Sequence, residues 1–294
     1  MPEAVKNVGA SVRARLLRIS KEKGQNFDLV LTHYAIERLL YRLVQSRHAD
    51  RFVLKGAMLL MTWFDEPFRG TRDLDLLGYG DSAPDAVLDV FREVLGQEQP
   101  DGVVFDAGTA RISRIREENE YGGLRMRATA DISGARISVN VDVGFGDATE
   151  PPVEWLDYPV LLDMPAPRLR GYARETVVAE KFQAMVDLGM ANSRMKDYYD
   201  LWIIGQAFEI DRSRLARAIS ATFARRSTTI PDAVPDGLSM AFAEDAVKRQ
   251  RWESFRQDLN VDPGPLDGIV SALEAFLMPA AAAARDGVGS EGDQ

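Results

Sequence analysis

The 294-residue chain contains no cysteine and only two histidines, His33 and His48. Without cysteine it cannot form a disulfide, a thiolate zinc site or a cysteine nucleophile. Two imidazoles are also too few for a histidine-rich metal site or a histidine-based relay, so we interpret both as structural residues. Any metal chemistry must therefore rest on carboxylates, which suit Mg²⁺ or Mn²⁺.

Long apolar runs and an excess of positive charge are missing as well. We find neither the apolar segment of a signal peptide nor a run of 18 or more apolar residues, and we expect a cytoplasmic protein with no membrane partner. With 36 Lys and Arg against 45 Asp and Glu, the net charge is −9, which argues against coating nucleic acid through bulk electrostatics. Local basic clusters at residues 11–23, 111–116, 168–174 and 248–251 fit either solvated surfaces or contact surfaces.

Hydrophobic periodicity predicts an α+β protein. Apolar and polar residues alternate over Thr71 to Leu77, and again over Leu124 to Ile132 and Ile137 to Val143 around a Ser133-Gly134 turn, as half-buried strands require. Prolines between residues 151 and 167 indicate a linker. The expected order is an N-terminal helical layer (1–50), a core with a mixed β-sheet flanked by helices (51–150), a Pro-rich linker (151–170), a C-terminal helical domain (171–278) and a disordered tail (279–294).

Helical spacing and turn residues give the remaining elements. A short strand is expected over Val103 to Asp106. Helices are expected over Val8 to Lys23, Asp28 to His48, Asp85 to Leu95, Tyr172 to Gly189, Lys196 to Phe208, Ser213 to Ala224, Ser239 to Leu259 and Leu266 to Met278.

Three carboxylates come from the polar faces of predicted strands. Asp73 and Asp75, two residues apart, project from one face, and a neighbouring strand can bring Asp142 beside them. Three adjacent carboxylates repel one another unless cations lie between them. Nucleotidyl and phosphoryl transfer use divalent metals held in this way. An Asp-x-Asp pair is also common at exposed strand ends, so the pair alone does not decide between a site and an ordinary surface.

A glycine turn precedes these carboxylates. The apolar run Phe52-Val53-Leu54 leads into Lys55-Gly56-Ala57 and a further apolar stretch, and this order of strand, glycine turn and helix recurs in enzymes that bind phosphates. Together with Asp73-Leu74-Asp75 it resembles the Gly-Ser plus Asp-x-Asp signature of the DNA-polymerase-β-like nucleotidyltransferase superfamily.

The chain is most similar to the AbiEii/AbiGii toxin family, which includes the MenT-type toxins. Four ordered motifs carry the resemblance, which covers roughly residues 28 to 230. The family's Lys-Gly-Gly turn resembles Lys55-Gly56-Ala57, and its Arg-x-(Ser/Thr)-x-Asp-x-Asp resembles Arg69-Gly70-Thr71-Arg72-Asp73-Leu74-Asp75. Its third carboxylate strand resembles Val141-Asp142-Val143, and its Glu-Lys followed by Lys-Asp-x-x-Asp resembles Glu180-Lys181 and Lys196-Asp197-Tyr198-Tyr199-Asp200.

The resemblance implies a toxin with a minimal nucleotidyltransferase fold. Its expected reaction moves a nucleoside monophosphate from CTP or UTP to the 3′ end of tRNA, which blocks aminoacylation and translation. The expected partners are tRNA, the nucleoside triphosphate and a cognate antitoxin, either AbiEi-like or a kinase that phosphorylates Thr71. The implied residues are Asp73, Asp75 and Asp142 for Mg²⁺ or Mn²⁺, Asp73, Lys181, Asp197 and Asp200 for catalysis, and Lys55, Gly56, Ala57, Arg69, Thr71 and Lys196 for nucleotide and phosphate binding.

Some alternatives stay open at this point. Ala57 stands where the family commonly has glycine and the superfamily serine, so a hydroxyl contact to phosphate is missing there, although backbone N–H groups near Gly56 or the Thr71 hydroxyl can replace it. Lys181 and Lys196 also fit ordinary solvated helix positions. A nucleotide-binding module without chemistry, or an enzyme that nucleotidylates or phosphorylates a protein hydroxyl, would share the same fold.

Overall fold

The computed structural model describes residues 7–64, 69–115, 122–257, 259 and 261–291. The chain divides into two compact units. Unit 1 comprises Met1–Gly146 and Glu154–Gly171, and unit 2 comprises Asp147–Val153 and Tyr172–Gln294.

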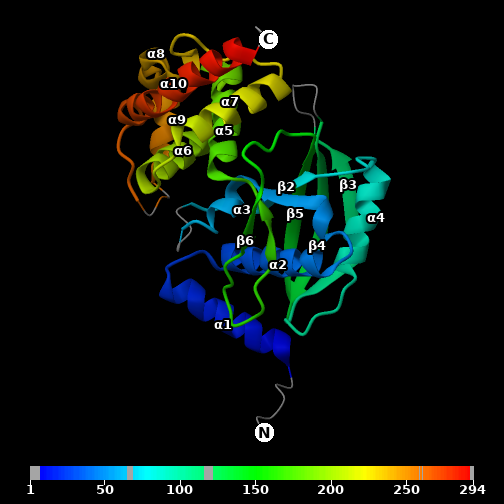
Figure 1. Ribbon diagram of the computed structural model, residues 1–294. Coiled ribbons are helices and arrows are strands. Elements are labelled where there is room, and N and C mark those ends of the chain that lie inside the picture. The colour runs from blue at the N-terminus through cyan, green and yellow to red at the C-terminus, as the bar shows by residue number, and fades with distance from the viewer. Residues whose placement is uncertain (1–6, 65–68, 116–121, 258, 260, 292–294) are drawn as a thin grey trace. The chain divides into compact units, whose positions relative to one another are not determined.

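Unit 1 is built on a seven-stranded sheet with the order β3-β4-β5-β2-β1-β7-β6 (Figure 1). Strand β2 runs parallel to β5 and β1 parallel to β7, while the other neighbours are antiparallel. The prediction of an α+β fold with a mixed sheet is therefore confirmed. The strands are β1 (Phe52–Lys55), β2 (Asp73–Gly78), β3 (Val104–Arg114), β4 (Leu124–Ile132), β5 (Ala135–Phe145), β6 (Glu154–Asp157) and β7 (Arg168–Gly171).

Helices cover one face of this sheet. In Figure 1, α2 crosses in front of the strands, and it contacts β5 while α4 contacts β3. Along β5 the residues Val139, Val141 and Val143 are buried, whereas Asn140 and Asp142, which point the other way, are half-buried. The polar face that carries the carboxylates is thus opposite the helical layer. The helices of unit 1 are α1 (Val8–Glu22), α2 (Phe27–Gln45), η1 (Ala49–Arg51), α3 (Gly56–Leu60) and α4 (Pro84–Leu95).

Helix α2 buries charges that its apolar pattern does not reveal. Arg42 forms a two-pronged ion pair with Asp101, at 2.6 and 3.1 Å, and Glu37 lies 2.9 Å from Arg38. All four side chains are almost completely inaccessible to solvent. Removing one member of such a pair leaves an uncompensated buried charge, at a cost of about 3–5 kcal/mol. The Arg42–Asp101 pair ties α2 to the segment that precedes β3, whereas the Glu37–Arg38 pair lies within the helix.

Unit 2 is helical. Its core includes the rings of Phe182 and Phe223, with centroids 5.4 Å apart, and the stacked rings of Tyr198 and Phe242, 5.2 Å apart. The elements are α5 (Arg174–Leu188), η2 (Gly189–Ala191), α6 (Met195–Ala207), α7 (Arg212–Arg225), η3 (Asp236–Leu238), α8 (Met240–Glu244), α9 (Ala246–Arg256) and α10 (Leu266–Glu291).

The expected Pro-rich linker over 151–170 is not a linker in the structure. It contains β6 and most of β7, which pair with each other and extend the sheet of unit 1 beyond β1. The prolines lie between the strands and not within them, so no ladder hydrogen bond is lost. The prolines therefore lie in the loops around two short strands, of which β6 forms the edge of the sheet and β7 lies next to it.

The expected disordered tail over 279–294 is helical through Glu291, and residues 292–294 lie outside the described residues. Helix α10 continues past Pro279, and Ala280, Ala281 and Ala284 are buried. Alanine is the best helix former, and burial of these small side chains adds packing. By length and composition, Leu266–Gly287 also meets the criterion for a membrane-crossing helix, but α10 packs on α6, α7 and α8, as a core helix does.

Two smaller differences have local causes. The strand expected to end at Asp106 runs to Arg114, because a bulge between Asp106 and Arg111 absorbs the turn-like Gly108. The helix expected over Ser239 to Leu259 is split into α8 and α9 at Asp245, whose side chain caps α9 by accepting hydrogen bonds from two backbone N–H groups.

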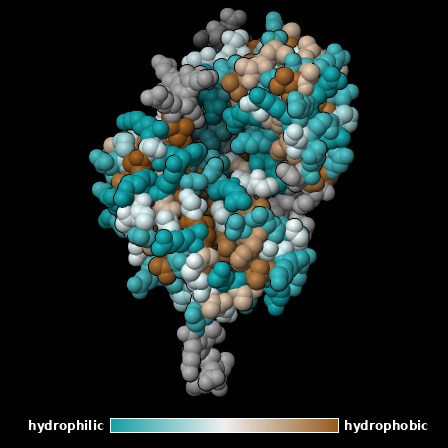
Figure 2. Space-filling model, turned by 180° about the vertical axis from the view of Figure 1, so that it is seen from behind, coloured by the Kyte–Doolittle hydropathy of each residue, from teal (hydrophilic) through white to brown (hydrophobic). Residues whose placement is uncertain are grey.

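Hydrophilic side chains cover most of the face shown in Figure 2. Hydrophobic side chains form small islands on this face. Among the described residues, the most exposed large hydrophobic side chains include Val104 and Trp155, at 69% and 62%. Single exposed apolar residues of this kind are normal and do not indicate a docking patch.

Candidate active site

Strand register brings three of the predicted residues into one row on the polar face. Asp75 of β2 pairs with Asp142 of the parallel strand β5, and on its other side with Lys55 of β1. Asp73, two residues before Asp75, pairs with Asn140. Residues in register on neighbouring strands point to the same face, so the carboxylates lie side by side, as the alternation of the sequence indicates.

Gly56 is required by the position of Asp75. The backbone of Gly56 has a φ of +66°, and a Cβ there would lie 2.1 Å from Oδ2 of Asp75. Any side chain would therefore both strain the backbone and collide with the carboxylate. The predicted glycine turn brings the chain against a carboxylate of the site. Helix α3, which follows the turn, has five residues.

Arg125 is the residue that sequence reasoning missed. Its guanidinium donates two hydrogen bonds of 2.6 Å to the carboxylate of Asp142. These bonds, with the charges of Asp142, Asp73 and Asp75, raise the pKa of Arg125 although partial burial lowers it. A signal was present, because a two-residue turn at Ser133-Gly134 places residue 125 opposite residue 142.

Asn140 and Lys55 complete the surroundings of the acidic pair. The side-chain amide of Asn140 donates a hydrogen bond of 3.0 Å to Oδ1 of Asp73. Lys55 is half-buried and in register with Asp75. Cationic side chains therefore flank the carboxylates on both sides, which offsets the mutual repulsion of Asp73, Asp75 and Asp142.

The chemistry of Asp73 and Asp75 fits a divalent ion, while Asp142 is already paired with Arg125. Asp73 and Asp75 offer carboxylate oxygens on one face, the ligands that Mg²⁺ and Mn²⁺ prefer. Both oxygens of Asp142, however, are engaged by Arg125. Over the residues that the structure describes, no group of three or more acidic or histidine side chains is arranged to hold a metal. Asp73 and Asp75 thus form an acidic pair next to the Arg125–Asp142 ion pair, and the role of Asp142 as a third metal ligand stays a prediction.

The other phosphate-binding candidates of unit 1 lie around the start of β2. Arg69 and Thr71 are half-buried and precede the strand, and Ala57 lies in α3. The backbone carbonyl of Thr71 is 2.8 Å from Nε2 of His33. Burial lowers the pKa of His33, so its neutral ring donates this bond and fixes the segment that leads to Asp73.

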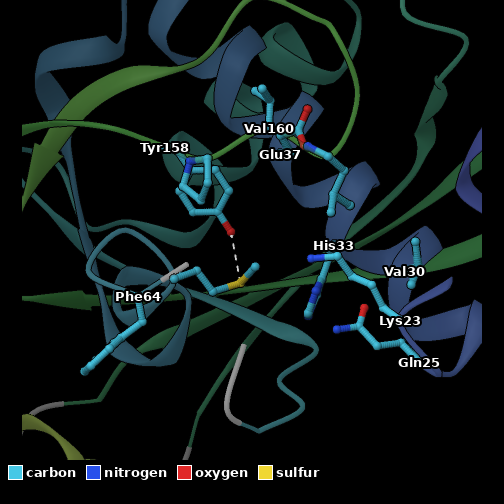
Figure 3. A pocket seen from close by; sticks show the side chains of 11 residues that line it. Lys23, Gln25, Val30, His33, Glu37, Phe64, Tyr158 and Val160 are labelled. Carbon is cyan, nitrogen blue, oxygen red and sulfur yellow. Dashed lines mark hydrogen bonds between the residues drawn. The ribbon is translucent and has the colours of Figure 1, made fainter. Parts of the chain in front are cut away.

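His33 also lines a small cavity (Figure 3). It has a volume of about 110 Å³ and is lined by His33, Glu37, Phe64, Tyr158 and Val160, among others. The Tyr158 hydroxyl contacts the sulfur of Met61, as the dashed line shows. None of the carboxylates on the polar face lines it, so the cavity is separate from the acidic pair.

In unit 2, the predicted catalytic residues form a buried ion cluster. Nζ of Lys181 lies 2.6 Å from Asp197 and 2.8 Å from Asp200, and both carboxylates are buried. Arg194 reaches the second oxygen of Asp197 at 2.6 Å. Lys181 on α5 and the two aspartates on α6 therefore join these helices, whereas Lys196 is exposed and stands apart.

A second ionic cluster of unit 2 was not predicted. Arg226 lies 3.2 Å from Glu180 and 3.4 Å from Asp147, and it also donates a hydrogen bond of 2.9 Å to Gln183. The Tyr172 hydroxyl is 3.4 Å from both acids. These residues are far apart in the sequence, so spacing gave no signal for the cluster.

A mixed sheet with an Asp-x-Asp pair on a central strand, next to a glycine turn, is the arrangement of a nucleotidyltransferase. Residues 38–279 match the family model described as nucleotidyl transferase AbiEii toxin, type IV toxin–antitoxin system. The chain therefore belongs to this toxin family. Membership implies a nucleoside triphosphate as substrate and a cognate antitoxin as partner.

Two crystal structures from Helicobacter pylori are similar in outline. One is of the protein JHP933, at 15% identity and a TM-score of 0.49, covering 89% of this chain and 96% of that one. The other is of a protein described as a nucleotidyltransferase, with the same identity and TM-score, covering 87% and 96%. A comparison with curated proteins found no match.

Proposed function

We propose that this toxin transfers a nucleoside monophosphate from CTP or UTP to the 3′ end of tRNA and so blocks aminoacylation and translation. The observation that carries the proposal is the row of Lys55, Asp75 and Asp142 beside Asp73 on the polar face of the sheet. The toxin acts in the cytoplasm, where tRNA and nucleoside triphosphates are present.

Asp73 and Asp75 hold Mg²⁺ or Mn²⁺ in this proposal, and Asp142 is a further ligand. The metal, when bound, neutralises charge on the triphosphate and lowers the pKa of an attacking hydroxyl. Asn140 keeps the Asp73 carboxylate in place through its hydrogen bond. Gly56 lets the backbone pass directly against Asp75, where an N–H group can approach a phosphate.

Lys55, Ala57, Arg69 and Thr71 serve nucleotide binding in the proposal. Lys55 supplies a positive charge next to Asp75. Thr71 supplies a hydroxyl at the start of β2, which also makes it the site at which a phosphorylating antitoxin would act, since a phosphate adds about −1.5 to −2 charges beside the acidic pair. An AbiEi-like antitoxin that covers the site is the other form of control.

Lys181 is the proposed phosphate-binding cation of unit 2, and Asp197 and Asp200 position it. The two aspartates hold Nζ at 2.6 and 2.8 Å. The exposed Lys196 is a second candidate for nucleotide binding in this unit. The functional role of Lys181 rests on the motif resemblance, and its structural role rests on these ion pairs.

The experiment that tests the proposal identifies the acceptor. The purified protein is incubated with each of the four α-³²P-labelled nucleoside triphosphates, together with total RNA, purified tRNA or total protein, and with Mg²⁺. We expect label on tRNA from CTP or UTP, at the 3′ end. Label on protein, or no label on any acceptor, would contradict the proposal. Asp75→Asn is the matched control, because it removes one negative charge without changing the size of the side chain.

A further inference from the structure

The polar face of the sheet carries two arginines that lie directly opposite each other. Arg111 of β3 is in register with Arg127 of β4, and both side chains are exposed. Arg127 is in turn in register with Asn140 of β5, and Asn140 with Asp73 of β2. One row therefore runs from the arginine pair to the acidic pair of the candidate active site.

Among the described residues, no carboxylate forms an ion pair with either arginine of this pair. Arg111 donates hydrogen bonds of 2.8 Å to the backbone carbonyls of Gly108 and Ala110. Arg127 has no hydrogen-bond or ion-pair partner in the part of the chain that the structure describes. Like charges directly opposite each other on neighbouring strands destabilise a sheet. The pair is thus a feature that the fold alone does not explain.

Neighbouring arginines of the same face show the contrast. Arg125 is paired with Asp142, and Arg136 is in register with Asp131. Each of these arginines faces a carboxylate across the strands. Arg127 lies between them along the face, and the residues in register with it, Arg111 and Asn140, are not carboxylates.

The surroundings of the pair are polar and open. Thr129 and Ser138, which are in register with each other, carry hydroxyls on the same face. Neighbouring strands are about 4.8 Å apart, so the backbone of Arg127 lies two strands, or roughly 10 Å, from that of Asp73. The arginine pair is therefore within reach of the last phosphates of a strand whose 3′ end lies at the acidic pair.

We propose that Arg111 and Arg127 bind a backbone phosphate of the RNA acceptor close to its reactive 3′ end, with the polar face of β3, β4 and β5 as the RNA track. This inference rests on the proposed function. Two neighbouring guanidinium groups can donate several charge-assisted hydrogen bonds to the oxygens of one phosphate. A local pair also reconciles RNA binding with a net charge of −9, since phosphates are contacted by few, well-placed cations.

The experiment compares Arg127→Ala and Arg127→Glu with a matched control, Arg114→Ala. Arg114 is also an exposed arginine of β3, but it is in register with Leu124 and so belongs to the other set of alternating residues. Since Arg127 is exposed and has no partner among the described residues, its replacement leaves the fold intact, which thermal unfolding verifies. The kinetic readouts are the KM for tRNA, the KM for the nucleotide and kcat.

We expect the KM for tRNA to rise about tenfold in Arg127→Ala and further in Arg127→Glu, with little change in the KM for the nucleotide. Arg114→Ala should behave as wild type. The salt dependence of RNA binding should become weaker in Arg127→Ala, because one phosphate contact fewer releases fewer counterions. An unchanged KM for tRNA would overturn the inference. A rise only in the KM for the nucleotide would also overturn it, because it would place the triphosphate at Arg127.

A direct binding measurement separates this inference from the proposed function. Fluorescence anisotropy with a labelled single-stranded RNA ending in a free 3′ hydroxyl needs no turnover. If wild type labels no RNA in the transfer assay, the proposed function fails, and weaker RNA binding by Arg127→Ala than by Arg114→Ala would still support the RNA track. Equal RNA binding by the two variants would refute it, whatever the transfer assay shows.

Discussion

At the scale of the residue, the candidate active site is a set of opposite charges in neighbouring register positions. Lys55 and Arg125 flank Asp75 and Asp142 across four strands. Arg125 donates hydrogen bonds to both oxygens of Asp142. The Arg125–Asp142 pair therefore competes with a metal for the third carboxylate.

This competition makes a prediction about Arg125→Gln. The variant frees Asp142, so a divalent ion at Asp73 and Asp75 gains a ligand and binds more tightly. Addition of Mg²⁺ should raise the Tm of Arg125→Gln by about 3–5 °C more than that of wild type. The measurement is differential scanning fluorimetry with and without Mg²⁺. Equal shifts in both proteins would show that Asp142 is not a ligand, and the double variant Arg125→Gln/Asp142→Asn should lose the extra shift.

At the scale of the element, two buried ionic contacts hold helices in place. Lys181 joins α5 to the two aspartates of α6 in unit 2. In unit 1, Glu37 of α2 accepts a hydrogen bond of 2.7 Å from the backbone N–H of Leu161 and lies next to Arg38. Each contact links a helix to a distant segment of its own unit, so each gives a stability prediction.

Replacement of Lys181 should affect folding as well as activity. Lys181→Met leaves two buried carboxylates without their cation and should lower the free energy of unfolding by about 3 kcal/mol. Lys181→Arg keeps the charge and should lose far less stability, while Lys196→Ala, at an exposed position, should lose none. Urea unfolding monitored by circular dichroism measures this. If Lys181→Met is as stable as Lys196→Ala, the ion cluster does not stabilise the fold. Any loss of activity in Lys181→Met would then reflect a functional role of Lys181.

Glu37 predicts a pH dependence of stability. Burial raises the pKa of Glu37 from 4.5 to about 7, although Arg38 and the Leu161 N–H lower it. Because the pKa is higher in the folded state, protonation of Glu37 adds stability as the pH falls from about 7 to 4.5, and this contribution is lost as the pH rises through 7.

The test compares wild type with Glu37→Gln, which keeps an acceptor for Leu161 but does not titrate. As the pH is lowered from 8 to 5, the free energy of unfolding of wild type should rise relative to that of Glu37→Gln, by on the order of 2 kcal/mol. All other groups titrate in both proteins, so they cancel. A difference that stays constant over this range would mean that Glu37 remains ionised in the fold.

At the scale of the whole molecule, the sequence predicted features that depend on local residue patterns better than features that depend on contacts between distant segments. The alternation around Asp73 and Asp142 predicted the strands that carry the carboxylates, because one face of each is buried. The strands β6 and β7 were not predicted, since four residues are too few for a clear alternation and the flanking prolines dominate the local signal. Helix α10 passes Pro279 because buried alanines beyond it outweigh the break.

The candidate site shows the same division. Its acidic residues and Gly56 could be named from motifs, whereas the pairing of Arg125 with Asp142 depends on strand register and the cluster around Lys181 on helix packing. Motifs identify residues that chemistry requires. The cations that balance them come from segments whose proximity is decided by the fold.

The central claim is that Asp73 and Asp75 carry metal-dependent nucleotidyl transfer, and its most direct test is the initial rate of label transfer from CTP or UTP to tRNA. The rate is measured for wild type, Asp73→Asn and Lys196→Ala, each with Mg²⁺, with excess EDTA, and with Mg²⁺ restored. Wild type and Lys196→Ala should transfer, stop in EDTA and recover, because the ion is held by oxygen ligands and exchanges readily. Asp73→Asn should remain folded and lose transfer by about a thousandfold or more. Transfer by Asp73→Asn at the wild-type rate, or by wild type in EDTA, would contradict the account.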